Sequence, residues 1–410
     1  MIPPLLRENA DFRRYWVGQT VSLFGDQISL IALPLTAVLV LHANAAQMGF
    51  LTTVLLVPNL LFSLHAGAWV DRRGRRRQTM LATDVGRALL LATVPVAYAF
   101  GHLTFAHLYV VAFLTGALSV LFYVAYSALF VALVPRDDFM NANSLLHGSR
   151  AFSFLGGPSV GGVLVQLLRA PYALAADVVS FLVSAFFLGR MRVEEPPGAT
   201  EDGEGVMTGA RWLWRSPVMR SNLGAVATIN YFNFVFFALF ILYATRSLHV
   251  RPATLGLVLG AGAVGGVLGS VVTGRISRRI GVGTTFALGC VLFPAPLVLV
   301  PAAGGPKWLV LALLFASEFG SGLGVMMLDI AAGSISAAIV PARLRSRVSG
   351  AFMVVNYGVR PLGTMTAGAL GSWIGLRPTL WFATVGAMLG ILWLLPSPIF
   401  GLRELPETAE

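Results

Sequence analysis

Gly67-Ala68-Trp69-Val70-Asp71-Arg72-Arg73-Gly74-Arg75-Arg76-Arg77 is the stretch of sequence that decides the fold. One long apolar run ends inside it, and the next begins just after its last arginine. Its two glycines permit tight turns and close approach of helices, and its acid stands directly before a cluster of arginines. A short basic loop between two apolar runs is typical of the cytoplasmic side of a membrane protein.

The composition of the whole chain also indicates a membrane protein. Of its 410 residues, 56% are hydrophobic and only 11% are charged, whereas soluble domains carry about 25% charged residues. The net charge of +11 comes from arginines in short loops rather than from a basic face, so we expect no nucleic-acid partner. A single cysteine, Cys290, excludes an internal disulfide.

Twelve apolar runs approach the roughly 20 residues that a helix needs to cross a bilayer. The predicted spans cover residues 15–41, 46–70, 78–101, 106–134, 141–168, 171–190, 221–245, 253–274, 284–303, 308–340, 347–373 and 378–396. The predicted fold class is therefore an all-α membrane protein with twelve transmembrane helices in two six-helix bundles.

A long polar connection separates the first six spans from the last six. It is rich in acids, glycine and proline, which is typical of a linker, and it ends in Trp212 and Trp214 flanked by arginines, which indicates a short interfacial helix. The predicted domains are listed in chain order: an N-terminal bundle over 1–191, a cytoplasmic linker with an interfacial helix over 192–220, a C-terminal bundle over 221–396 and a cytoplasmic tail over 397–410.

The loop charges predict the orientation. With both termini in the cytoplasm, 21 basic residues fall in cytoplasmic loops and termini and 5 on the opposite side, as the positive-inside rule requires. The apolar first run is long enough to remain as a span, so we expect no cleavable signal peptide. The predicted location is the cytoplasmic (inner) cell membrane.

The two halves of the chain share landmarks. Gly67–Gly74 closes the second span, and Gly274-Arg-Ile-Ser-Arg-Arg-Ile-Gly281 closes the eighth with the same glycine spacing and two arginines before the second glycine. Val134-Pro135-Arg136 after the fourth span matches Val340-Pro341 followed by Arg343 after the tenth. The two pairs of landmarks predict a duplicated six-helix unit, as in many secondary transporters.

The Gly-x3-Asp-Arg-x-Gly-Arg-Arg pattern, placed between the second and third of twelve spans, resembles the signature loop of the major facilitator superfamily. The resemblance implies two bundles that rock around a central site, with the loop acid latching the outward-facing state near the eleventh helix. The residues that it assigns to this gate are Gly67, Asp71, Arg72, Gly74, Arg75 and Arg76, with Arg345 and Arg347 as partners.

Two further patterns narrow the resemblance. Gly157-Pro158-Ser-Val-Gly161-Gly162 resembles a helix-packing motif of the superfamily's drug–proton antiporters, although Ser153 stands where that motif has a further glycine. Ser22-Leu-Phe-Gly25-Asp26-Gln27 and Asp84-Val-Gly-Arg87 resemble the macrolide and siderophore exporter branch. This branch implies export by proton antiport.

Ionisable residues inside the bilayer are costly and need a reason. Asp26 and Glu318 have no cation within four residues in the sequence, so we predict that they bind and release the coupling proton. Asp84 and Arg87 share a helix face and can pair. Arg150 and Arg360 are alternative partners for Asp26 and Glu318 across helices. Asp177 is a further acid inside a predicted span, and Asp329, which lies nearer the cytoplasmic end of its span, could instead join the gate.

Aromatic and amide side chains crowd the seventh span. Asn230, Tyr231, Asn233 and Phe234 could either pack against lipid or line a cavity for large amphipathic molecules. The sequence shows no zinc spacing, nucleophile elbow or phosphate loop, so we expect neither an enzyme nor a cofactor.

The predicted function is a secondary transporter that exports drug-, macrolide- or siderophore-type molecules by proton antiport with alternating access. Its expected partners are a small-molecule substrate, protons and the lipid bilayer, and we expect a monomer. Two alternatives remain open: an importer or narrow metabolite exporter of the same fold, and a non-transporting membrane receptor or scaffold.

Overall fold

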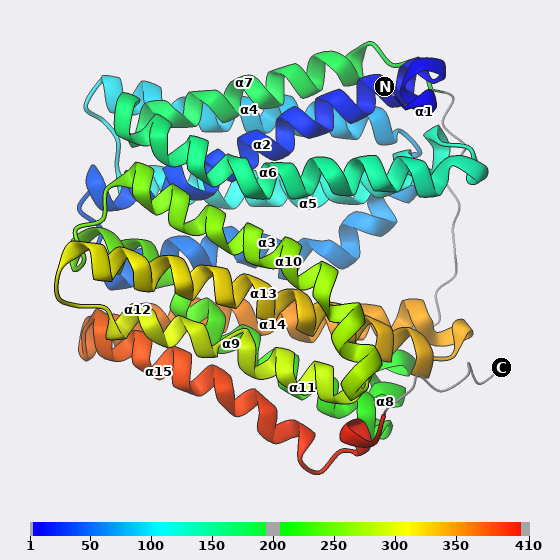
Figure 1. Cartoon of the computed structure of the whole chain (residues 1–410). Coiled ribbons are helices and arrows are strands. Elements are labelled where there is room, and N and C mark those ends of the chain that lie inside the picture. Colours follow the sequence, from blue (N-terminus) through cyan, green and yellow to red (C-terminus); the bar gives the residue numbers. More distant parts are fainter. Residues whose placement is uncertain (1–2, 194–205, 403–410) are drawn as a thin grey trace. The chain divides into compact units, whose positions relative to one another are not determined.

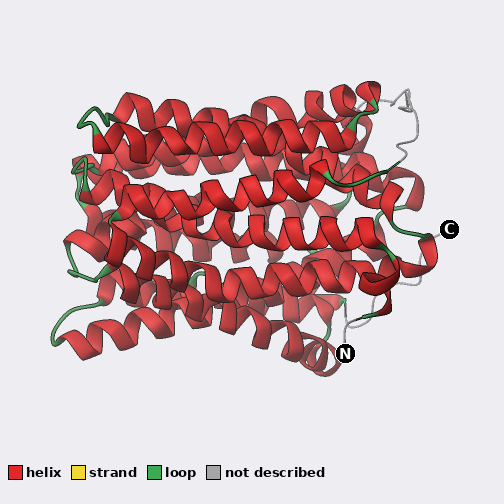
Figure 2. Ribbon diagram, turned by 90° about the horizontal axis from the view of Figure 1, so that it is seen from above, coloured by secondary structure: helices red, strands yellow, loops and turns green. Residues whose placement is uncertain are grey.

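The computed structural model describes residues 3–193 and 206–402, and the regular secondary structure in these ranges is helical (Figure 2). Residues 194–205 of the predicted linker and the end of the predicted tail, from residue 403, lie outside the described residues. The chain divides into two compact units. Unit 1 comprises Met1–Ala43, Val54–Asp202 and Arg251–Leu257, and unit 2 comprises Asn44–Thr53, Gly203–Val250 and Val258–Glu410.

The helices of the N-terminal half are labelled in Figure 1. Their bounds are α1 Pro4–Glu8, α2 Ala10–Leu39, α3 Ala45–Arg73, α4 Arg76–Ala99, α5 Phe105–Leu133, η1 Arg136–Asp138, α6 Phe139–Leu168 and α7 Ala170–Gly189. Polar side chains cap the N-termini of α2 and α5. Asn9 Oδ1 accepts from the Phe12 backbone N–H at 2.8 Å, and Thr104 caps α5 in the same way. Such caps satisfy donors that a helix start leaves free.

The C-terminal half begins with the short helix predicted before the seventh span. The elements are α8 Val206–Arg215, α9 Pro217–Arg246, α10 Pro252–Ile280, α11 Val282–Leu292, η2 Ala295–Val298, α12 Leu299–Ala302, α13 Lys307–Ile339, η3 Ala342–Leu344, α14 Arg345–Trp373, α15 Leu376–Met388, η4 Leu389–Leu394 and η5 Pro398–Gly401. The predicted span over 284–303 is interrupted, because Pro294 and Pro296 cannot continue the helical hydrogen bonds of α11.

Eleven helical segments within the described residues are long and apolar enough to cross a membrane. The predicted span over 347–373 corresponds to α14, which is 29 residues long but is not among these eleven. It carries polar side chains along its length, including Asn356 and Arg360. The predicted all-α membrane fold is confirmed, and the chain is a multi-pass membrane protein.

The two glycines that end the predicted repeat have the same local geometry. Gly74 follows α3 with φ 61°, and its N–H donates to the Val70 carbonyl at 3.1 Å. Gly281 follows α10 with φ 88°, and its N–H donates to the Ser277 carbonyl at 2.9 Å. A positive φ strains a residue with a Cβ atom, so glycine ends both helices for the same physical reason.

Small residues bring helices together within unit 1. A Cβ atom added at Gly161 would lie 3.1 Å from the Ile28 Cα of α2, and one added at Gly157 would overlap the Gln27 side chain. Gly162 packs against the backbone at Pro252 in the same way. In a bilayer the lipid tails are as apolar as the helices, so burial of apolar surface does little to hold helices together. Van der Waals contact between closely packed backbones therefore contributes much of the association energy.

Helix α7 has a polar inner face and an apolar outer face. Asp177, Ser180 and Ser184 recur on one side at helical spacing and are at most 4% exposed. On the other side, Val179 and Phe186 are 57% and 52% exposed. This inverted pattern places polar groups inside unit 1 and apolar groups on its surface, as a helix surrounded by lipid requires.

Candidate functional site

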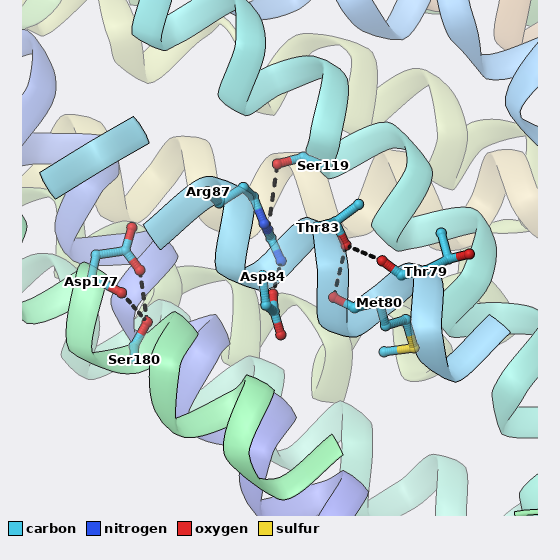
Figure 3. Close-up of polar contacts among 8 residues, drawn as sticks. All are labelled: Thr79, Met80, Thr83, Asp84, Arg87, Ser119, Asp177 and Ser180. Carbon is cyan, nitrogen blue, oxygen red and sulfur yellow. Dashed lines mark hydrogen bonds and ion pairs between the residues drawn. The ribbon is translucent and has the colours of Figure 1, made fainter. Parts of the chain in front are cut away.

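A buried ion pair lies on α4. Arg87 Nη2 donates to Asp84 Oδ1, and the side chains of both residues are at most 1% exposed (Figure 3). Helical spacing of three residues puts the two side chains on one face, as the sequence predicts. The Ser184 hydroxyl of α7 lies close enough to the Asp84 carboxylate to interact with it, whereas Nε of Arg87 has no hydrogen-bond partner in the described part of the chain. The guanidinium therefore keeps one unused donor.

Two aromatic rings enclose the guanidinium of Arg87. Its Cζ lies 4.3 Å from the ring centroid of Phe122 on α5 and 4.2 Å from that of Phe181 on α7. Nη1 lies 3.4 Å from the Ser119 hydroxyl oxygen, which can accept a hydrogen bond from it (Figure 3). Both ring faces attract the positive charge, so they stabilise a cation that is shielded from water.

A second buried acid, Asp177, stands on α7. Its Oδ1 accepts from the Ser180 hydroxyl at 2.8 Å (Figure 3). Its Oδ2 accepts from the Ser29 hydroxyl of α2. Asp177 is 1% exposed. A Cβ atom added at Gly25 of α2 would overlap both the Ser180 hydroxyl and the Asp177 carboxylate. Glycine at this position is what allows α2 to approach the polar face of α7.

Asp26 completes the cluster. It is partly buried on α2 and lies within electrostatic range of Arg87 and of the two other carboxylates. Three acids from α2, α4 and α7 thus face one guanidinium, all inside unit 1; we call Asp26, Asp84, Asp177 and Arg87 the charge cluster. The cation that the structure brings to Asp26 is Arg87, rather than either of the predicted alternatives, Arg150 and Arg360.

The sequence places Asp177 among the acids inside the bilayer, but the prediction assigns it no role in the site. The signal for it is local: an acid in an apolar span with serines three and seven positions later puts three polar groups on one helix face. Arg150, by contrast, is an exposed residue of α6, with the phenols of Tyr123 and Tyr126 within electrostatic range.

Glu318 occupies a different environment in unit 2. It lies on α13 facing α10, where a Cβ atom added at Gly262 would be 3.4 Å from its Oε2. In the described ranges, no charged side chain is close enough to interact appreciably with it. Gly262 and Gly265 let α10 approach the α13 backbone at this level. Glu318 therefore lies beside the backbone of α10 at Gly262, which has no side chain there.

A cavity of about 670 Å³ lies within unit 2. Apolar side chains of α9, α13 and α14 form most of its wall, among them Ile229, Leu328 and Phe352. Its polar and charged lining residues are Asn230, Asn233, Asp329, Ser336, Arg345, Ser349, Asn356 and Arg360. A mostly apolar wall with a few convergent polar groups is the usual character of a small-molecule site.

Arg360 is the partly buried cation of this cavity. Its guanidinium lies 4.5 Å from the ring centroid of Tyr357 and 5.0 Å from that of Phe234, with Nη2 3.4 Å from Asn356 Oδ1. Asp329 lies within electrostatic range but forms no ion pair with it. Of the four predicted cavity residues, Asn230 and Asn233 line the wall, Phe234 lies beside Arg360, and the Tyr231 hydroxyl forms a hydrogen bond with Thr366.

The signature loop is the turn between α3 and α4. Gly74 makes the turn, and the Arg73 guanidinium lies 4.8 Å from the ring centroid of Trp69. The Asp71 side chain lies outside what the structure describes, and Asp71 belongs to unit 1 whereas Arg345 and Arg347 belong to unit 2. The predicted latch between them stays a prediction. Arg345 Nη2 donates to the Ala337 carbonyl at 2.9 Å.

In the comparison with protein families, the model described as Major Facilitator Superfamily matches residues 15–364, with a second match over residues 223–410. Among curated proteins, the multidrug efflux pump Tap of Mycolicibacterium fortuitum is 27% identical over 87% of this chain and 88% of its own length. The uncharacterized MFS-type transporter YfiS of Bacillus subtilis (strain 168) is 25% identical over 96% and 94%.

Solved structures show the same fold. A mutant of the nucleoside transporter NupG superimposes with a TM-score of 0.76 at 11% identity, covering 94% of this chain and 99% of the other. A bacterial homologue of the iron transporter ferroportin, in its inward-facing state, also gives 0.76, at 17% identity over 96% and 99%. Both likenesses concern the fold alone.

Proposed function

Since the chain belongs to the Major Facilitator Superfamily, a family of membrane transporters, we propose that it exports hydrophobic or amphipathic small molecules by proton antiport. The observation that carries this proposal is the charge cluster of unit 1, where Asp26, Asp84 and Asp177 face the single cation Arg87. With every group ionised the cluster would carry two uncompensated negative charges in an apolar surrounding. Bound protons lower that charge.

A proton bound at the cluster can be coupled to movement. Asp84 is held by the ion pair with Arg87, and both oxygens of Asp177 accept hydrogen bonds from serines. Asp26 interacts with the cluster through space, so it is the acid whose proton is most easily exchanged. Protonation of Asp26 changes the electrostatic force on α4 and α7. In a carrier with alternating access, that change would favour one conformation over the other.

The cavity of unit 2 fits the proposed substrate class. Its wall is mainly apolar, and its amides and charges offer a few polar contacts without a dense hydrogen-bond network. Such a lining suits drug-, macrolide- or siderophore-type molecules with an apolar body and a polar group. The likeness to Tap, whose name describes a multidrug efflux pump, supports export over import.

The orientation is part of the same proposal. Twenty-one basic residues lie in the loops and termini that face the cytoplasm if both termini are inside, against five on the other side. We place the protein in the cytoplasmic membrane as a monomer, with small molecules, protons and lipid as its partners.

Uptake into inside-out membrane vesicles tests the function. The substrates are a panel of macrolides, cationic dyes and siderophores, and the variants are Asp26→Asn and Glu318→Gln. The matched control is Asp137→Asn, which neutralises an exposed acid in the turn before α6. We expect accumulation that requires the proton gradient, persists in Asp137→Asn and is lost in Asp26→Asn.

Two results would contradict the proposal. Accumulation of the panel without a proton gradient would exclude proton antiport, and normal coupling in both Asp26→Asn and Glu318→Gln would exclude the assigned acids. If no member of the panel is moved, the alternative of an importer or a narrow metabolite exporter takes its place.

A further inference from the structure

A basic pocket lies at the end of unit 1 where α2 begins and α7 ends. Its volume is about 630 Å³, and its lining residues are Arg14, Gly189, Arg190, Met191 and Arg192. Three of these five residues are arginines, and Arg190 and Arg192 are exposed. We call this the arginine pocket. The charge cluster and the cavity of unit 2 share no residue with it.

One acid, Asp11, contacts two residues of the pocket but does not balance the positive charge of its arginines. Asp11 Oδ1 accepts from Arg14 Nη1 at 2.7 Å and from the Arg192 backbone N–H at 3.3 Å. Among the residues given above, three guanidinium groups therefore meet one carboxylate, which leaves an excess of two positive charges. An excess of this sign attracts an anion, and guanidinium groups match the geometry of phosphate oxygens.

The carbonyl groups at the end of α7 already have a donor. Arg77 Nη1 lies 3.1 Å from the Leu188 carbonyl oxygen and 3.2 Å from that of Gly189. The Arg190 guanidinium instead lies 4.2 Å from the ring centroid of Phe186, at the outer surface of the helix. It is thus directed to the boundary between the pocket and the apolar surface.

An apolar stripe on α7 leads to this guanidinium. Val179, Leu182 and Phe186 are 57%, 48% and 52% exposed, and Arg190 follows Phe186 by four residues on the same face. From Val179 to Arg190 the helix rises about 16 Å at roughly 1.5 Å per residue. One leaflet of a bilayer's hydrocarbon core is about 15 Å thick. The stripe therefore has the length of one acyl chain.

We propose that the arginine pocket binds the phosphate headgroup of an anionic phospholipid, with an acyl chain along the Val179–Leu182–Phe186 stripe. The phosphate would bind the guanidinium groups of the pocket. The acyl chain would lie on the apolar stripe, which ends at the Arg190 guanidinium. On the proposed topology the site faces the cytoplasmic leaflet, where basic pockets meet anionic headgroups. The lipid would bridge α2 and α7, the helices that carry Asp26 and Asp177. It does not depend on the transported substrate.

Native mass spectrometry of the full chain in detergent micelles, titrated with phosphatidylglycerol or phosphatidylcholine, tests the site. We expect one saturable phosphatidylglycerol that is preferred over phosphatidylcholine. Removing two cations in Arg190→Gln/Arg192→Gln should weaken its binding about 30-fold, at the strength expected for two arginines near a lipid surface. Arg13→Gln is the control, because it removes one arginine beside Arg14 at the start of α2, and Arg13 does not line the pocket. It should bind like the wild type.

A second variant separates lipid from a soluble anion. Phe186→Ala keeps all the charges and shortens the stripe, so it should weaken phosphatidylglycerol binding while the protein remains folded. Should the double variant fail to fold, Arg190→Gln alone is expected to weaken binding about 5-fold. Equal binding of the two lipids, or wild-type binding by Arg190→Gln, would overturn the proposal. Displacement of the lipid by millimolar inorganic phosphate would assign the pocket to a soluble anion instead.

Discussion

The Arg87 guanidinium lies 4.2 Å from the ring centroid of Phe181 while it pairs with Asp84, so an aromatic side chain of α7 contacts the ion pair of α4. α7 also carries Asp177 on the same inner side. Any change of charge on Asp26 or Asp177 therefore acts on a cation that is already enclosed by rings from α5 and α7. This arrangement makes the charge cluster a unit whose members should not respond independently to substitution.

Removing Arg87 should destabilise the protein more than removing the whole pair. Arg87→Gln leaves the Asp84 carboxylate buried without its cation, and breaking a buried pair in this way costs about 3–5 kcal/mol. Asp84→Asn/Arg87→Gln removes both charges and should recover much of that loss. Thermal unfolding in detergent, followed by circular dichroism, measures both. A double variant that is as unstable as the sum of its single variants would show that the pair is not coupled.

Gly25→Ala should disturb α2 where it meets α7. Its added methyl group would overlap the Ser180 hydroxyl and the Asp177 carboxylate, and overpacking of this kind costs about 1–3 kcal/mol. We expect a lower unfolding temperature and reduced transport. Gly148→Ala on α6 is the control, since a Cβ atom there would meet nothing within 4 Å. Equal behaviour of the two variants would contradict the tight α2–α7 contact.

The pH dependence of transport should come from the charge cluster. For an antiporter that takes up protons from outside, export should increase as the outside pH falls, because a protonated Asp26 is then more populated on that side. Asp26→Asn cannot exchange a proton, so gradient-driven transport should fall about 10-fold or more. Exchange of labelled for unlabelled substrate without a gradient should persist. Loss of exchange as well would make Asp26 a residue needed for binding or folding.

Charge in the unit 2 cavity should set the preference among substrates. Arg360→Gln removes the partly buried cation and should weaken the apparent affinity for anionic substrates about 10-fold, the value of one charge-assisted hydrogen bond. Asp329→Asn should act in the same direction on cationic substrates. Competition between a cationic dye and an anionic analogue of similar size reads both effects. Variants that leave this preference unchanged would place the substrate elsewhere.

Cysteine labelling can settle the orientation. Cys290 is fully buried, so the wild type should not react with a membrane-impermeant maleimide. His102 and Asp137 are exposed residues in successive connections of unit 1. In intact cells, His102→Cys should be labelled and Asp137→Cys should be protected until the membrane is opened. The reverse pattern would invert the proposed topology.

Helical periodicity explains why some of the site can be predicted from sequence. Asp84 and Arg87 are three residues apart, and the geometry of a helix alone places them together. The same logic finds the glycines of the helix-packing motif and the membrane-crossing helices, because hydrophobic length and small residues are local signals. The family, too, can be recognised from its signature loop, and the family match confirms it.

Tertiary neighbours are what the sequence leaves open. Asp26 has no nearby cation along the chain, so the sequence alone suggests an isolated acid. The packing of both α2 and α4 against α7 nevertheless brings Arg87 and two more carboxylates within electrostatic range of it. Glu318 likewise has no nearby cation along the chain, and in the structure it does remain apart from the charged side chains of the described residues. No local pattern distinguishes these two outcomes, because the partner comes from a different helix.

The two faces of α7 imply an uneven tolerance of mutation. Outward positions such as Val179 and Leu182 require only an apolar side chain of moderate size, so they should tolerate substitution by other aliphatic residues. Inward positions such as Asp177 and Ser180 are fixed by hydrogen bonds and by the missing side chain at Gly25. Random mutagenesis of this helix should therefore yield functional clones whose changes fall on one side of it.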